Sequence, residues 1–98
     1  MLLKHFKLFQ CLYCAVPDTL ALTELEVAEE KVGKRIKQGV IYCGRCQRWF
    51  MVKDEICFLS QDHHREVAEE LSFLKRWEEK LPTYVTQQAR PHNLSSGS

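Results

Sequence analysis

Two pairs of cysteines constrain this chain more than any other feature of its sequence. Cys11 and Cys14 form one Cys-x-x-Cys pair, Cys43 and Cys46 form a second, and residues 15–42 separate the two pairs. Each pair turns tightly enough for both sulfurs to reach one ion, so two pairs together complete a tetrahedral four-thiolate site. The spacing therefore predicts a structural metal centre whose four ligands are these cysteines.

Other uses of paired cysteines fit less well. Structural disulfides are disfavoured because the chain has an odd number of cysteines and its first residues lack the apolar core of a signal peptide. A thioredoxin-like redox motif needs one such pair in a βαβ setting and not two matched pairs. A rubredoxin-like iron site uses a similar arrangement. The spacing favours zinc and leaves iron open.

Length and charge set further bounds. A chain of 98 residues forms one small domain with a modest core, and a structural metal stabilises such a domain. The net charge of +1 falls to about −1 once four thiolates hold one Zn²⁺, so no global attraction to nucleic acid is expected. No apolar run is long enough to span a membrane. We expect a cytoplasmic protein without a membrane partner.

The apolar pattern predicts an α+β fold, a small zinc-ribbon-like antiparallel sheet with a short N-terminal helix and a C-terminal amphipathic helix. Residues 23–31 fit a strand or a helix equally, and periodicity leaves that choice open. Residues 29–35 are expected to form an exposed hairpin loop around Gly33. The other expected elements are a helix over residues 1–10, strands over 20–22, 36–42, 48–52 and 56–59, and a polar turn over 53–55.

The last third of the chain predicts one helix and a tail. Asp62 is a candidate N-cap for a helix of about residues 62–81, which Pro82 ends. Residues 83–98 are polar and are expected to form a flexible tail, so the predicted domain covers residues 1–82. The expected apolar face of the helix comprises Val67, Leu71, Leu74, Trp77 and Leu81, with Phe73 on its flank.

The sequence lacks the residue patterns of an enzyme. A metal held by four protein thiolates has no open coordination position for water or substrate. Neither a nucleophilic triad nor a phosphate-binding glycine loop is present, and the isolated Cys57 is expected to be a small apolar residue. The chain is therefore predicted to be non-catalytic.

The segment from Tyr42 to Phe58 carries more large apolar side chains than a small sheet covers on both faces. One interpretation is that the C-terminal helix buries the second face. The other is that part of this face stays exposed and binds a partner. Both interpretations remain open at this point.

Three segments share a pattern with a known family: the short helix leading into Cys11, the run Gly39–Phe50 and the tail Glu69–Trp77. Over about residues 1–82 the chain resembles the small zinc-ribbon activator subunit of class I methyltransferases, in its archaeal form. These methyltransferases act on tRNA, rRNA and translation release factors. The family usually has proline where this chain has Leu12, and two further prolines near the last strand are missing. Their loss frees two backbone N–H groups and affects edge pairing.

The resemblance implies a heterodimer in which the methyltransferase subunit carries S-adenosylmethionine and the catalytic residues. This chain would bind no small molecule. It would add a strand to the partner's sheet and cover apolar surface near the cofactor pocket, which stabilises the partner. The expected contact surface comprises Phe6, Phe9, Trp49, Met51, Val52, Ile56 and Phe58.

Two other functions compete with this interpretation. A nucleic-acid-binding zinc ribbon of the transcription or translation machinery needs a basic face with aromatic residues. Here such a contact with RNA is expected to be weak or indirect. A rubredoxin-like electron carrier is less favoured, because those proteins usually lack an added amphipathic helix. The residues that offer a partial basic face are Lys34, Arg35, Lys37, Arg45 and Arg48.

Overall fold

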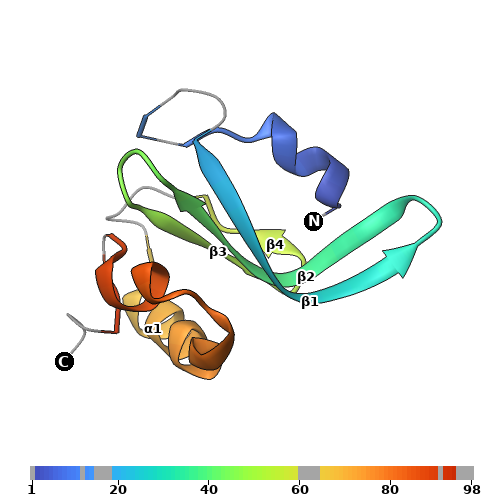
Figure 1. The fold of residues 1–98 in the computed structure, drawn as a ribbon. Coiled ribbons are helices and arrows are strands. Elements are labelled where there is room, and N and C mark those ends of the chain that lie inside the picture. The colour runs from blue at the N-terminus through green and yellow to red at the C-terminus, as the bar shows by residue number, and fades with distance from the viewer. Residues whose placement is uncertain (1, 12, 15–18, 60–64, 91, 95–98) are drawn as a thin grey trace.

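A computed structural model of the chain describes residues 2–11, 13–14, 19–59, 65–90 and 92–94, without the side chains of residues 7 and 8. The fold is an antiparallel four-stranded sheet in the order β1-β2-β3-β4, with helices on both sides of it (Figure 1). The predicted α+β class is confirmed. The elements are the 3-10 helix η1 (Leu3–Leu8), the strands β1 (Leu20–Glu30), β2 (Gly33–Cys43), β3 (Trp49–Lys53) and β4 (Ile56–Cys57), the helix α1 (Val67–Arg76), the 3-10 helix η3 (Glu78–Lys80) and the π-helix η4 (Tyr84–Gln88).

Strands β1 and β2 form one long hairpin that extends beyond the rest of the sheet (Figure 1). The open choice over residues 23–31 is thus resolved in favour of a strand. The expected loop over 29–35 is reduced to a turn at Lys31 and Val32, because Glu30 pairs with Gly33 across the hairpin. Gly33 has a φ of 122°, a conformation that side chains disfavour.

The hairpin contains a register irregularity that changes which face its side chains occupy. Pairing shifts on both sides of Glu26, next to Gly39 and Gln38 of β2. As a result, Ile36 and Ile41 lie in the same apolar cluster although a regular strand places residues five apart on opposite faces. Regular alternation over the strand predicted at residues 36–42 places Ile36 on the same face as Val40, and the register irregularity makes that prediction wrong.

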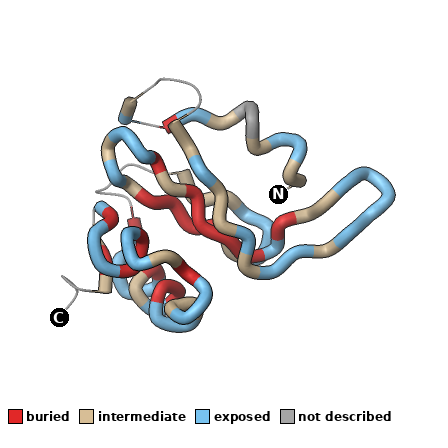
Figure 2. Tube along the Cα trace, viewed as in Figure 1, coloured by how far each residue is buried: buried red, intermediate tan, exposed pale blue. Residues whose placement is uncertain are grey.

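The sheet separates two apolar cores. The first lies between the sheet and α1, where Trp49 and Met51 meet Leu74 and Val85. The second lies on the opposite face, where Phe50 and Val52 meet the N-terminal segment. Figure 2 shows the buried positions concentrated in the middle of β2 and β3, which contribute to both cores.

Helix α1 is shorter than predicted. It begins at Val67 and ends at Arg76, and the candidate cap Asp62 lies outside the described residues. Phe73 and Leu74 are its buried apolar residues, while Val67 is exposed. The predicted apolar face is therefore largely confirmed, with Phe73 buried as well and Val67 left out of it.

A buried charged cluster joins α1 to the residues on either side of it. Both Nε and Nη2 of Arg65 contact the Glu70 carboxylate, with Nη2 2.6 Å from Oε1. His92 Nε2 lies 2.8 Å from the same oxygen. Burial raises the pKa of Glu70, but the hydrogen bonds from His92 and Arg65 outweigh it, so the pKa lies below its usual value. The Arg65 guanidinium also lies over the Trp49 ring, 5.1 Å from its centroid.

The expected flexible tail is instead packed over residues 84–90 and 92–94, here called the C-terminal strap. Val85, Thr86 and Ala89 are buried in it, and the Tyr84 ring lies 4.7 Å from the Tyr42 ring. Trp49 Nε1 donates a hydrogen bond to the carbonyl of His92 at 2.9 Å. The polar composition concealed this packing, since the apolar contacts come from isolated residues such as Tyr84 and Val85 and many of the others are made by polar side chains and backbone groups. The folded unit extends beyond the predicted boundary at residue 82.

The structure corrects the expected exposed surface of β3. Trp49 and Val52 are 0% exposed and Met51 is 2% exposed, because α1 and the strap cover one face and the N-terminal segment covers the other. Ile56 of β4 is 58% exposed. Of the two interpretations of this segment, coverage by the chain's own helices applies to β3, and exposure applies to Ile56.

Replacing Trp49 tests this assignment to the core. The substitution Trp49→Ala should lower the free energy of unfolding by about 3–5 kcal/mol, because it empties a fully buried site. Ile56→Ala at the exposed edge is the matched control and should change it by less than about 1 kcal/mol. Denaturant unfolding measures both values. Similar small losses in the two variants would contradict burial of Trp49.

Candidate metal centre

The fold brings the two cysteine pairs together from the segment after η1 and from the turn between β2 and β3. Cys11 and Cys14 follow η1, whereas Cys43 ends β2 and Cys46 lies in the tight turn that leads into β3. We call residues 43–46 the second knuckle. The predicted ligand set is therefore assembled in one place, and it lies against the core that contains Ile41 and Phe50.

The spacing of the sulfur atoms suits a tetrahedral metal ion. Cys11 Sγ lies 3.5 Å from Cys46 Sγ, and Cys14 Sγ lies 3.7 Å from Cys43 Sγ. All four sulfurs lie within 4.8 Å of one another. Metal–sulfur bonds of about 2.3 Å in a tetrahedron separate the sulfurs by about 3.8 Å, whereas a disulfide bond is only about 2.05 Å long. The four thiols thus form a site of metal-binding geometry and not a disulfide framework.

Backbone hydrogen bonds shape the second knuckle. Gln47 N–H donates to the Cys43 carbonyl at 2.9 Å, and Cys43 N–H donates to the Arg48 carbonyl at 2.8 Å. Gly44 N–H donates to the carbonyl of Thr19, which anchors the knuckle to the residue before β1. The knuckle is therefore held by the strands on both sides of it.

The thiols influence one another's ionisation. Burial raises the pKa of Cys14 to about 12, and hydrogen bonds from the Cys43 and Cys46 thiols add to the shift. Burial also raises the pKa of Cys11. At Cys43 burial acts in the same direction, but hydrogen bonds from the Thr19 side chain and from backbone N–H groups lower its pKa to about 6. Without a cation, the lowered pKa of Cys43 favours its thiolate, whereas the raised pKa values of Cys11 and Cys14 favour their protonated thiols.

The arrangement is suited to structural metal binding. Four protein sulfurs fill a tetrahedral shell, so no position is left for a reacting group. Within the described part of the chain, no other group of three or more ligand side chains is suitable for a metal. Cys57 is not part of the site, and burial raises the pKa of its thiol to about 11. That environment matches the apolar role expected for Cys57.

The predicted partner-binding residues are distributed over both cores. Phe6 and Phe9 are half-buried beside the metal site, with their rings edge to face and 6.5 Å apart. Phe58 is half-buried on the α1 side, and Ile56 is exposed between the two cores on the edge strand. The structure therefore brings Phe6 and Phe9 together but does not place all seven residues on one open surface.

Two features that support the site have no recognisable signal in the sequence. Thr19 contacts the Cys43 thiol, with its Oγ1 3.4 Å from the sulfur, and the strap binds the residue after Cys46. Thr19 directly precedes a predicted strand, which offers no recognisable motif. The strap acts through backbone atoms. Almost every residue type has the same backbone groups, so the sequence does not reveal this contact.

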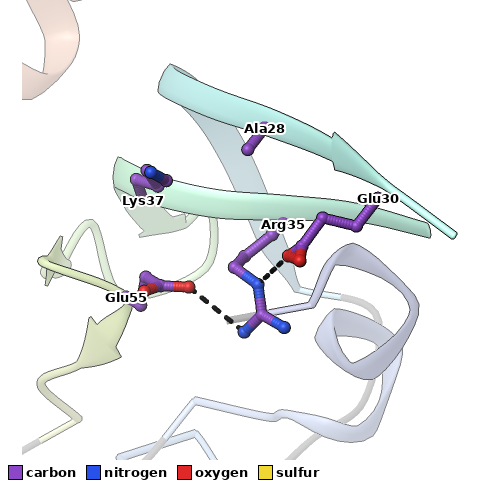
Figure 3. A pocket seen from close by; sticks show the side chains of 5 residues that line it. All are labelled: Ala28, Glu30, Arg35, Lys37 and Glu55. Atoms are coloured by element: carbon purple, nitrogen blue, oxygen red, sulfur yellow. Dashed lines mark hydrogen bonds and ion pairs between the residues drawn. The ribbon is translucent and has the colours of Figure 1, made fainter. Parts of the chain in front are cut away.

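A polar cavity lies beside the half of the β1–β2 hairpin that is nearer its turn, away from the cysteines. Its volume is about 430 Å³, and its lining residues are Ala28, Glu30, Arg35, Lys37 and Glu55. Figure 3 shows Arg35 between two carboxylates, with ion pairs to Glu30 and, at 3.1 Å, to Glu55. Its guanidinium is therefore already neutralised by the chain itself.

Comparisons with protein-family models, with curated proteins and with solved structures find no match for this chain. Among the described residues, no helix is both long and apolar enough to cross a membrane. The interpretation of the site therefore depends on its own geometry.

Replacing one ligand tests the metal centre. Cys46→Ser should abolish stoichiometric metal binding and leave the chain unfolded at neutral pH, because structural zinc sites contribute about 10–16 kcal/mol to folding. Elemental analysis and circular dichroism measure both effects. Cys57→Ser is the matched control, since Cys57 lies outside the site, and it should retain one metal ion per chain. Cooperative unfolding that persists after chelation of the metal would contradict the structural role.

The thiol pKa values predict proton release on metal binding. At pH 7 Cys43 is largely ionised, whereas Cys11 and Cys14 carry protons that a cation displaces. Metal uptake should release at least two protons per ion at pH 7. A pH-indicator titration in weak buffer measures this number. Release of less than one proton per ion would mean that the four thiols are not the ligands.

Proposed function

We propose that this chain is a non-catalytic activator subunit that binds and stabilises an S-adenosylmethionine-dependent methyltransferase acting on tRNA, rRNA or a translation release factor. The observation that carries the proposal is a closed four-cysteine site that supports a sheet with an open, apolar edge at β4. This arrangement agrees with the resemblance seen in the sequence. The site, the open edge and the resemblance together favour a protein-binding module that forms a heterodimer in the cytoplasm.

Zinc is the metal that we propose for the site. Zinc bound by four thiolates has no redox chemistry, and its role is to link distant segments of a small domain. In this chain the linked segments are the one after η1 and the turn between β2 and β3. A colourless protein with one zinc ion per chain supports this assignment, whereas a red protein would identify iron.

Strand β4 is the favoured docking edge. It is the last strand of the sheet, so one row of its backbone groups faces away from β3. Its residue Ile56 is the most exposed of the predicted contact residues, at 58%. Half-buried Phe58 and Leu59 follow it on opposite sides of the sheet. An edge of this kind offers main-chain hydrogen bonds for affinity and apolar side chains for specificity.

Activation would then result from a shift in the partner's conformational population. A subunit that binds only the folded, cofactor-competent form of the methyltransferase stabilises that form by mass action. Burial of the apolar edge residues contributes favourably to binding, and only the surplus over the entropy lost on association appears as affinity. In this proposal S-adenosylmethionine and the catalytic groups belong to the partner.

The competing function, a nucleic-acid-binding zinc ribbon, has less support from the charged residues. Lys34 pairs with Glu24 at 3.1 Å, Arg35 pairs with two carboxylates, and the Arg48 guanidinium lies over the Tyr13 ring at 3.6 Å. Three of the five residues of the predicted basic face are therefore engaged within the chain. This favours protein over RNA as the principal partner.

The direct test is co-expression of the chain with methyltransferases from its source, followed by purification in high salt. A stable one-to-one complex, in which the methyltransferase gains solubility and binds S-adenosylmethionine in a calorimeter, supports the proposal. Recovery of only ribosomes, RNA polymerase or nucleic acid would instead identify a nucleic-acid-binding ribbon.

A charge at the docking edge tests the proposed surface. Ile56→Asp should weaken methyltransferase binding at least tenfold, because it places a carboxylate in an apolar interface. Val32→Asp is the matched control. Val32 is 54% exposed at the tip of the β1–β2 hairpin, remote from β4. Equal affinities of the two variants, measured by calorimetry, would exclude β4 as the docking edge.

A further inference from the structure

We infer that the C-terminal strap positions the second knuckle of the metal site through the backbone of Arg90, and that this contact slows the loss of the metal. The inference concerns the four-cysteine centre alone and does not depend on the proposed partner. It rests on a continuous series of contacts that runs from the helix α1 to the residue after Cys46.

The strap adds a short parallel pairing to the start of β3. Arg90 N–H donates to the carbonyl of Gln47 at 2.7 Å, and Trp49 N–H donates to the carbonyl of Arg90 at 3.0 Å. Arg48 and Arg90 thereby form a parallel bridge. The strap binds the edge of β3 that β4 leaves open, since β4 pairs only with Val52 and Lys53.

Gln47 has a backbone conformation that needs such support. It follows the ligand Cys46 directly, and its φ is 64°, a left-handed conformation that is unfavourable for a non-glycine residue. Its N–H donates to the Cys43 carbonyl at 2.9 Å, and its carbonyl accepts from Arg90. The same residue is therefore bound to the knuckle through one group and to the strap through the other.

The strap is itself anchored. Side-chain contacts hold His92 to Glu70 of α1 and hold Trp49 to the His92 carbonyl. Within the strap, Asn93 Nδ2 donates to the Ala89 carbonyl at 2.9 Å, and a backbone bond joins Leu94 to Thr86. A position set by α1 is thus transmitted to Arg90 and from there to Gln47.

This geometry couples the metal site to the strap. If the strap favours the metal-bound shape of the knuckle, then bound metal favours the docked strap by the same factor. Metal binding and C-terminal packing are then two parts of one equilibrium, although they involve opposite faces of the sheet.

The experiment compares two substitutions at one position in the full chain. Arg90→Pro removes the N–H that binds Gln47, whereas Arg90→Ala keeps it and removes only the side chain. Co²⁺ is the probe, because its visible absorption bands report the geometry of a four-thiolate site. Loss of one hydrogen bond should speed chelator-driven release of Co²⁺ about three- to tenfold in Arg90→Pro and shift its bands. Arg90→Ala should match the wild type within twofold.

A third variant separates positioning from general loss of stability. Phe73→Leu weakens the core under α1 without touching the hydrogen bonds of Arg90. At saturating Co²⁺ it should leave the absorption bands unchanged. Bands that move equally in Phe73→Leu and Arg90→Pro, or release rates that are equal in the two Arg90 variants, would overturn the inference.

A fourth variant decides the question if Arg90→Pro does not fold. His92→Ala loses the contact with Glu70 but keeps the backbone of the strap. Release of Co²⁺ at least twice as fast as in the wild type supports the inference, and an unchanged rate overturns it.

Discussion

The packing of four thiols against one face of the sheet is the interaction on which the rest of this fold depends. The sulfurs lie at tetrahedral spacing, and the raised pKa values of Cys11 and Cys14 mean that these two thiols keep their protons until a cation displaces them. A cation at this point joins the N-terminal segment to the turn between β2 and β3. That link closes a core which would otherwise consist of a few side chains around Ile41 and Phe50.

The other face of the sheet is stabilised by different means. Its core is apolar and contains Trp49, Leu74 and Val85, but it is bordered by the buried cluster of Arg65, Glu70 and His92. Removing one member of such a cluster leaves an uncompensated charge in the interior. A small domain thus combines a metal-linked core and an ion-paired core, and the two share strands β2 and β3.

The comparison of sequence with structure shows which kinds of interaction a sequence reveals. The cysteine ligands and the sheet were predictable, since spacing and alternation follow directly from side-chain chemistry. The C-terminal strap was not, because it packs through the backbone of Arg90 and small residues such as Ala89. The face of Ile36 was also missed, since a register irregularity changes the alternation without altering composition. Burial of Trp49 depended on a helix whose docking the sequence left open.

The two cores have a consequence for how β3 is aligned in the sheet. Along this strand Trp49 and Met51 point to one core and Phe50 and Val52 point to the other, so both faces are apolar. In most sheets a one-residue slip is prevented because it would bury polar side chains. Here a slip would exchange one set of apolar residues for another along the middle of the strand, and polarity would oppose it only at the ends, where Arg48 or Lys53 would enter a buried position. The alignment of β3 therefore depends mainly on side-chain volume and on the short connection, residues 47–48, between Cys46 and the strand. An insertion or deletion in that connection would shift the strand and is not expected to be tolerated.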